Sequence, residues 1–441
     1  MASREWLASG KLQWNDPDLA AYTSRLLAPI EHNFGLDTHK VITDARHDSL
    51  WTNGQFHPVM NDAATGYPGL TEYSTDRDRY LYPRPPPAGA SAAFKDFVAL
   101  VNDTLRELIV VPTLNPKGLE PADLTQTLTI ENSQLKLEFN ASTGAISSMQ
   151  EKGGTKTQWV APGGALGEFV YRTYTQKADI NRYCSQLTPG FQPSDTNLAW
   201  WPWSKPGMDL SILNDTAMPP LAECSRAWPV TLKKAFKTAA GGSSDGAQTM
   251  LMQLKLPTNA VTLFGGMGEI TLNVTLPAPS TTQTPTDFST PSVELTITWK
   301  NKTATRLAES SWLSFVPLVP EPASGYQLDV LGSPLDPLSV VFNGSRHFHA
   351  VHRGVCYNGP SGSPVQQTGR LAIETLDAPL VAPGDTAHLI DFDNKLPDLS
   401  GGFHFNLHNN VGWDASAPWW YSQDAAFRFR LQINAPPGCW P

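Results

Sequence analysis

Charged side chains are scarce in this chain of 441 residues, since Asp, Glu, Lys and Arg make up only 17% of it. An average globular protein contains roughly 25%. The 32 basic residues are outnumbered by 41 acidic ones, which gives a formal net charge of -9. We therefore expect no nucleic-acid partner, because phosphate contacts require a basic surface.

Long hydrophobic runs are missing as well. No apolar run reaches the roughly 18 residues that a membrane-spanning helix needs. The N-terminal sequence MASREWLASGKLQW lacks the charged segment followed by an apolar one that marks a secretory signal. The sequence as given therefore predicts no membrane partner and does not specify a compartment.

Cysteine is rare too, and its four positions are far apart in the sequence: Cys184, Cys224, Cys356 and Cys439. Without a CxxC pair they do not have the spacing of a zinc or redox motif. Isolated thiols are the favoured interpretation, and a disulfide such as Cys184 to Cys224 is the alternative.

What the chain does contain is proline, tryptophan and a change of hydrophobic period. There are 38 prolines and 14 tryptophans, and the prolines exceed the usual ~5%. A helix is expected from Asp16-Pro17, where an N-cap acceptor precedes a proline, and a second one from Ser91 to Pro112. We interpret residues 1–120 as a helical bundle region.

After Pro121 the period changes from 3.6 to 2, which is typical of strands. Strands are expected at 128–130, 135–139, 145–149, 293–299, 339–342, 371–375, 403–407 and 427–431. Many short strands without intervening helices predict antiparallel sheets. We therefore expect residues 121–441 to form a large antiparallel β super-sandwich in two lobes, so that the chain is mainly β.

Motifs for nucleophilic or phosphate chemistry are absent from the sequence: there is no GxSxG, no P-loop and no GxGxxG that opens a helix. The glycine-rich segment 265–268 is interpreted as a tight turn between strands. No catalytic residue is assigned.

Histidines and aspartates gather in two regions. His347 and His349 would share one strand face, as would His404 and His408 on an unbroken strand, so each pair could in principle bind a metal. Polar side chains on the wet face of a strand are the favoured interpretation. Two carboxylates occur in the segment 391–394, where solvation at a loop edge is favoured over a catalytic pair.

Aromatic residues provide the more suggestive pattern. One cluster lies at 200–203, and another at 413–421 follows two asparagines. Stacking on a tryptophan and hydrogen bonds from amides and carboxylates are what a sugar ring requires, whereas core packing is the alternative for these tryptophans. The candidate sugar-binding residues are Asn409, Asn410, Trp413, Asp414 and Trp419.

The order of several motifs resembles the C-terminal part of glycoside hydrolase family 38-like, α-mannosidase-like proteins, closest to an uncharacterised branch of that group. The matching segments are 25–27, 31–37, 128–132, 166–171, 205–207, 302–306 with Glu309, Trp312 and Phe315, 336–337, 343–344, 349–351, 376–380, 406–410 and 427–429. Gly412 to Pro418 departs from the branch's Trp-Gly-Thr-Asn-Phe-Pro, so that a site lined by that loop would be altered.

The resemblance implies a helical bundle followed by a galactose mutarotase-like β super-sandwich. It also implies a retaining glycosidase, in which an aspartate of a preceding α/β barrel attacks the sugar and a zinc ion holds its hydroxyls. In the family a histidine of the helical region is one zinc ligand, and by position His32 is the candidate here.

The sequence contains no such barrel, and its helical segment starts almost at Met1. We therefore expect no cofactor in this chain alone, with zinc bound only if a barrel domain is supplied. The resulting prediction is a carbohydrate-active protein that is not hydrolytic alone, with carbohydrate and a missing barrel domain as partners. The alternatives are a stand-alone carbohydrate-binding or interaction module and a mutarotase-like enzyme that uses the β domain alone.

Overall fold

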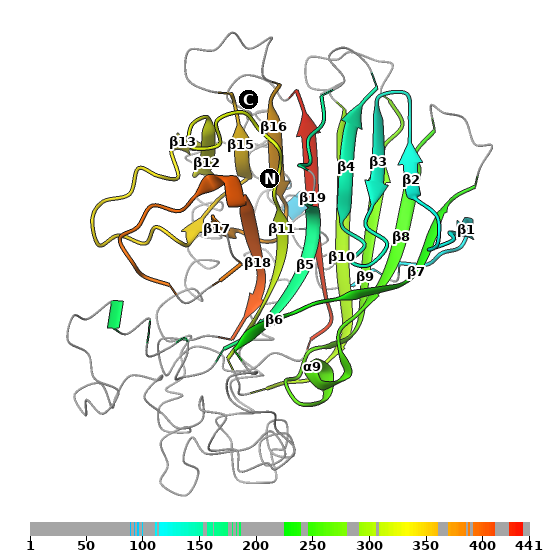
Figure 1. Cartoon of the computed structure of the whole chain (residues 1–441), viewed down its shortest axis with the longest axis horizontal. Helices are drawn as coiled ribbons and strands as arrows, with labels where there is room; N and C mark the ends of the chain where they lie inside the picture. Colours follow the sequence, from blue (N-terminus) through cyan, green and yellow to red (C-terminus); the bar gives the residue numbers. More distant parts are fainter. Residues whose placement is uncertain are drawn as a thin grey trace, which may run out of the picture. The chain divides into compact units, whose positions relative to one another are not determined.

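The computed structural model describes two large antiparallel sheets (Figure 1). The described residues are 111–112, 114–152, 157–161, 163–174, 225–239, 246–279, 291–305, 308–359, 369–384, 387–388, 391–410 and 423–434, with single positions between 89 and 99 and between 179 and 186. The chain divides into two compact units, and the sheets belong to the one made of Thr113–Leu198, Met208–Val411 and Trp420–Pro441.

Most of the expected helical region lies outside the described residues, including the helix from Asp16 and the candidate zinc ligand His32. Four positions of the expected second helix are described, and they are helical and exposed: Ala92, Lys95, Asp96 and Ala99. The boundary between the two predicted domains remains a prediction. None of the described helices is long and apolar enough to cross a membrane.

One sheet runs, within the described residues, in the order β14-β17-β18-β11-β5-β4-β3-β2, with β6 paired to β5. Its strands are β2 (Leu128–Glu131), β3 (Leu135–Phe139), β4 (Ile146–Glu151), β5 (Leu166–Thr173), β6 (Arg226–Trp228), β11 (Glu309–Phe315), β14 (His349–Ala350), β17 (Leu380–Pro383) and β18 (Phe403–Asn409). The pairing is antiparallel throughout.

The other sheet runs in the order β1-β7-β8-β9-β10-β19-β16-β15-β12-β13 among the described residues. Its strands are β1 (Leu119–Pro121), β7 (Thr231–Thr238), β8 (Gln248–Lys255), β9 (Met267–Leu276), β10 (Ser292–Lys302), β12 (Tyr326–Val330), β13 (Ser333–Leu335), β15 (Gly354–Tyr357), β16 (Leu371–Thr375) and β19 (Ala425–Ile433). Two short helices are also described, α9 (Thr258–Thr262) and η8 (Leu399–Gly401).

The two sheets pack face to face because each strand buries alternate residues. In β3, Leu135, Leu137 and Phe139 are buried, whereas the residues between them are half-exposed. The inward side chains of both sheets form one continuous apolar core, which includes Phe169 and Phe315 of one sheet and Trp299 and Phe429 of the other. The predicted mainly β, antiparallel sandwich is therefore confirmed.

Two local expectations were wrong. Residues 339–342 were expected to be a strand, but they lie in a loop and turn in which Val341 and Phe342 are exposed. The Asp336 carboxylate accepts a hydrogen bond from the Leu338 backbone and so favours a turn over an extended chain. Cys356 of β15 is buried and disulfide-bonded rather than an isolated thiol, and its partner lies outside the described residues.

The expectation of a tight turn between strands at 265–268 was wrong: the helix α9 and a turn at residues 263–264 precede the segment, and Met267 and Gly268 already belong to β9. Gly265 has a φ of 76°, and a Cβ atom on it would lie 2.6 Å from the Thr303 carbonyl oxygen. The backbone at residue 265 can therefore approach the end of β10 this closely only with glycine at this position. This close approach helps to build the cluster described next.

Candidate functional site

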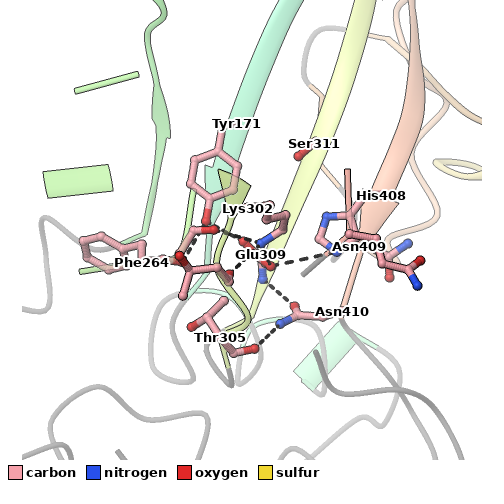
Figure 2. Close-up of polar contacts among 12 residues, drawn as sticks. Tyr171, Phe264, Lys302, Thr305, Glu309, Ser311, His408, Asn409 and Asn410 are labelled. Carbon is pink, nitrogen blue, oxygen red and sulfur yellow. Dashed lines mark hydrogen bonds and ion pairs between the residues drawn. The ribbon is translucent and has the colours of Figure 1, made fainter. Parts of the chain in front are cut away.

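A cluster of polar side chains lies inside the sandwich, where β5, β11 and β18 run side by side (Figure 2). Ser311 of β11 lies opposite Tyr171 of β5 on one side and opposite His408 of β18 on the other. Their side chains face the interior, since Leu313, two residues along the same strand, belongs to the apolar core. All three are buried.

An ion pair lies at the centre of this cluster. The Lys302 ammonium is 2.5 Å from the Glu309 carboxylate, and both side chains are 0% exposed. Lys302 also donates to the carbonyl oxygens of Gly265 at 2.9 Å and Thr303 at 3.3 Å. Because Lys302 ends β10 and Glu309 begins β11, the pair joins the two sheets.

The Tyr171 hydroxyl completes the environment of the carboxylate. It lies 2.5 Å from Glu309 Oε2 and 2.9 Å from the carbonyl oxygen of Phe264, so its single proton can be donated to either acceptor. Burial raises the pKa of Tyr171 well above its usual value, and the Glu309 charge adds to the shift. Tyr171 therefore remains a protonated donor at neutral pH.

Burial is the largest influence on the other titratable groups of the cluster. It raises the pKa of Glu309, against the opposing effect of the Lys302 ammonium, and it lowers the pKa of Lys302. It also lowers the pKa of His408 well below its usual value, in the same direction as the Lys302 charge. His408, whose Nε2 lies 3.8 Å from Glu309 Oε1, is therefore neutral, and Lys302 is the group that compensates the carboxylate.

Asn410, one of the predicted sugar-binding residues, is bound into this cluster. Its Oδ1 accepts a hydrogen bond of 2.7 Å from the Glu309 backbone N–H, and its Nδ2 donates to the Thr305 carbonyl oxygen at 3.1 Å. Its own N–H donates to the Glu309 carbonyl oxygen at 3.2 Å. Asn410 is buried, so its amide fixes the chain at the end of β18 and does not face solvent.

Asn409, its neighbour in the candidate site, lies on the other face of the sheet opposite Ser310. It is half-buried, and its Nδ2 donates to Asn406 Oδ1 at 2.8 Å. Figure 2 shows the Asn409 side chain directed away from Glu309. The remaining predicted sugar-binding residues, Trp413, Asp414 and Trp419, lie outside the described residues.

His404 and His408 were expected to be polar side chains on the wet face of a strand, and this was wrong because both are buried. A β-bulge between Ser311 and Trp312 shifts the register, so that His408 lies opposite Ser311 but His404 lies opposite Ser314. The two histidines therefore face opposite sides of the sheet. His404 is 2.8 Å from both Ser314 Oγ and the Gly384 carbonyl oxygen.

His347 and His349 make different contacts. His349 Nε2 lies 3.1 Å from the carbonyl oxygen of Arg346, whereas His347 Nε2 lies 2.8 Å from Asp393 Oδ1. In the sequence, His347 and Asp393 are 46 residues apart and belong to two separate groups of polar residues. The fold brings them together from two loops.

In the sequence, Lys302 and Glu309 stand out only as parts of the motifs that resemble the α-mannosidase-like family. Strict alternation along β10 buries Val293, Leu295 and Ile297 and would direct residue 302 outward. Asn301, with a φ of 56°, interrupts that alternation and turns Lys302 inward. The signal in the sequence was the position of Lys302 at the end of an alternating strand, seven residues before Glu309.

The closed cluster limits what this arrangement can do chemically. A carboxylate, a tyrosine and a histidine together could transfer protons, but Tyr171 and Glu309 are fully buried and His408 is buried beside them. The cluster instead compensates a buried charge and holds the Asn410 backbone in place.

Comparison with known proteins gives one family and several distant structures. A family model described as "Domain of unknown function (DUF5054)" matches residues 2–271. No curated protein sequence matches the chain.

Solved structures match over most of their length at low identity. A galactose mutarotase-like protein from Lactobacillus casei is 13% identical, with 70% of this chain and 99% of that chain covered and a TM-score of 0.33. A galactose mutarotase related enzyme from Lactobacillus acidophilus is 8% identical over 70% and 97% of the two chains, with a TM-score of 0.34. A putative aldose 1-epimerase from Escherichia coli is 14% identical over 70% and 98%, with a TM-score of 0.28.

Proposed function

This chain belongs to the family described as "Domain of unknown function (DUF5054)", and we propose that it is a carbohydrate-active protein that binds a sugar through the segment following β18. The observation that carries the proposal is the fixation of Asn410, whose amide bonds the Glu309 and Thr305 backbones. A binding segment benefits from a rigid attachment, because less conformational entropy is then lost on binding.

The composition of that segment supports a sugar as the ligand. Trp413 and Trp419 supply faces on which the apolar side of a sugar ring can stack, and Asp414 supplies a hydrogen-bond acceptor for its hydroxyls. Asn409, which is half-buried at the end of β18, offers an amide immediately before the segment. Asn410 acts as a positioning residue.

The finer proposal is that the chain is the helical and β-sandwich part of an α-mannosidase-like glycosidase. The ordered motifs support it, and two residues of the strongest motif, Lys302 and Glu309, form the central ion pair. Glu309 is fully buried and is not placed to attack a sugar. Hydrolysis would require a barrel domain that brings its nucleophile and zinc, to which His32 would add one ligand, and no step through zinc follows from the described residues.

Two assays on the full chain test this function. On a glycan array, the wild type should bind α-linked mannose oligosaccharides, and the signal should be lost in Trp413→Ala and Trp419→Ala. Release of aryl alcohol from aryl α-mannosides should not exceed the blank. A flat array with folded wild-type protein would contradict the binding proposal, and release above the blank that survives repurification would contradict the non-hydrolytic part.

A further inference from the structure

A mixed set of potential metal ligands lies between two loops of the same compact unit. His347 precedes β14, and Asp391 and Asp393 lie between β17 and η8. One ligand atom from each of the three residues lies within 4.8 Å of the others, and all three side chains are half-buried. From this arrangement we propose that His347, Asp391 and Asp393 bind one Zn²⁺ ion and so clamp the two loops together.

The donor set decides which ion fits. One imidazole nitrogen and two carboxylate oxygens suit zinc, whereas calcium and magnesium prefer oxygen ligands alone. Ligands of a tetrahedral zinc at about 2.0–2.2 Å from the ion lie roughly 3.4 Å apart. The three ligand atoms lie 4.8 Å or less from one another, so shifts on the order of 1 Å bring them to the zinc spacing. His347 Nε2 and Asp393 Oδ1, which are 2.8 Å apart, would move slightly apart to admit the ion.

A second layer of hydrogen bonds holds the ligands in place. Gln186 Nε2 donates to Asp391 Oδ1 at 2.7 Å, and Gln186 Oε1 accepts from the Phe392 backbone at 2.9 Å. One glutamine thus fixes both the carboxylate and the chain beside it. Such outer partners orient metal ligands and raise their affinity.

The two loops are also joined directly. The Asn343 backbone donates to Asn394 Oδ1 at 2.7 Å, and Asn394 Nδ2 donates to Asn343 Oδ1 at 2.8 Å. Arg346 adds a hydrogen bond of 2.7 Å to the Asn394 carbonyl oxygen. His347 is therefore presented to the aspartates by a preformed contact rather than by two independent loops.

Among the described residues, Lys395 and Arg346 border the site. The Lys395 ammonium lies 3.7 Å from Asp393 Oδ2, but its side chain is 86% exposed and can move into solvent. Arg346 is engaged with the carbonyl oxygens of Asn394 and Val340. Zinc displaces Lys395 from the carboxylate, so that Lys395→Ala should bind zinc more tightly than the wild type.

Zinc binding by the chelator-treated full chain tests the proposal. Isothermal titration and metal analysis after dialysis should show that Asp391→Asn/Asp393→Asn binds one equivalent fewer than the wild type. Asp123→Asn/Asp336→Asn is the matched control, because it removes the same two negative charges from exposed loop aspartates, and it should retain the equivalent. Gln186→Leu should weaken binding about 10- to 100-fold.

Thermal unfolding separates loss of the site from loss of the fold. With chelator present, wild type and double variant should melt alike, and one equivalent of Zn²⁺ should raise the melting temperature of the wild type alone. Equal zinc binding by wild type and double variant would overturn the proposal. An equal loss of zinc in Asp123→Asn/Asp336→Asn would overturn it too, because binding would then follow net charge.

Discussion

The Lys302 ammonium and the Glu309 carboxylate meet at 2.5 Å with no exposed surface on either side chain. They connect the last residue of β10 to the first residue of β11, and therefore one sheet to the other. Asn410 bonds the backbone of the same Glu309. The ion pair and the amide of Asn410 are thus parts of a single cluster.

Removing one partner of this pair should destabilise the fold strongly. Lys302→Met leaves the Glu309 charge buried without compensation and should lower the free energy of unfolding by about 3–5 kcal/mol, whereas Lys302→Met/Glu309→Leu should recover most of that loss. Denaturant titrations provide the values.

The exposed pair Lys136–Glu138, at 2.6 Å with 39% and 35% of the side chains exposed, is the matched control. Lys136→Met should cost less than about 1 kcal/mol. Equal losses in Lys302→Met and Lys136→Met would show that the buried pair has no special role.

Asn410→Ala should cost more stability than Asn409→Ala. Truncation of Asn410 leaves the Glu309 N–H and the Thr305 carbonyl oxygen without their amide partner inside the protein, at about 1–3 kcal/mol. Asn409 is half-buried and makes one side-chain bond, to Asn406, so we expect about 1 kcal/mol there. Thermal unfolding of both variants checks the order, and the reverse order would contradict the anchoring role of Asn410.

Tyrosine burial predicts a loss of stability at alkaline pH. Burial raises the pKa of Tyr357 to about 12, and the Glu321 charge acts in the same direction, whereas an unfolded tyrosine titrates near ~10. The folded state thus keeps its proton longer than the unfolded state. The contribution of Tyr357 to the free energy of unfolding is therefore fully present below pH ~10 and is lost as the pH rises towards about 12.

Tyr357→Phe cannot ionise at this position, so its free energy of unfolding should fall less steeply between pH 10 and 12 than that of the wild type. Denaturant titrations across this range measure the two slopes. Tyr171, whose pKa burial also raises, contributes equally to both proteins. Burial raises the pKa of Tyr326 as well, but the Tyr357 charge adds to that shift, so part of the difference between the two slopes comes from Tyr326. Identical slopes would contradict the assignment.

The strands were predictable wherever side-chain alternation is regular, as in β3 and in residues 293–299 of β10. The polar cluster around Glu309 could not be predicted in this way, because its geometry depends on places where the alternation of side chains is interrupted. Asn301, at a φ of 56°, and the bulge beside Ser311 decide which side chains turn inward. Spacing along the chain also cannot show that His347 and Asp393 meet, since only the packed loops bring them together.

The binding affinity for an α-linked mannose oligosaccharide, measured by isothermal titration on the full chain, tests the central claim most directly. Trp413→Ala and Trp419→Ala should each weaken binding at least about tenfold, or about 1.4 kcal/mol. Phe342→Ala, which removes an exposed aromatic ring on another loop, should bind like the wild type. Unchanged affinity in both tryptophan variants, or no binding by folded wild type, would contradict the claim.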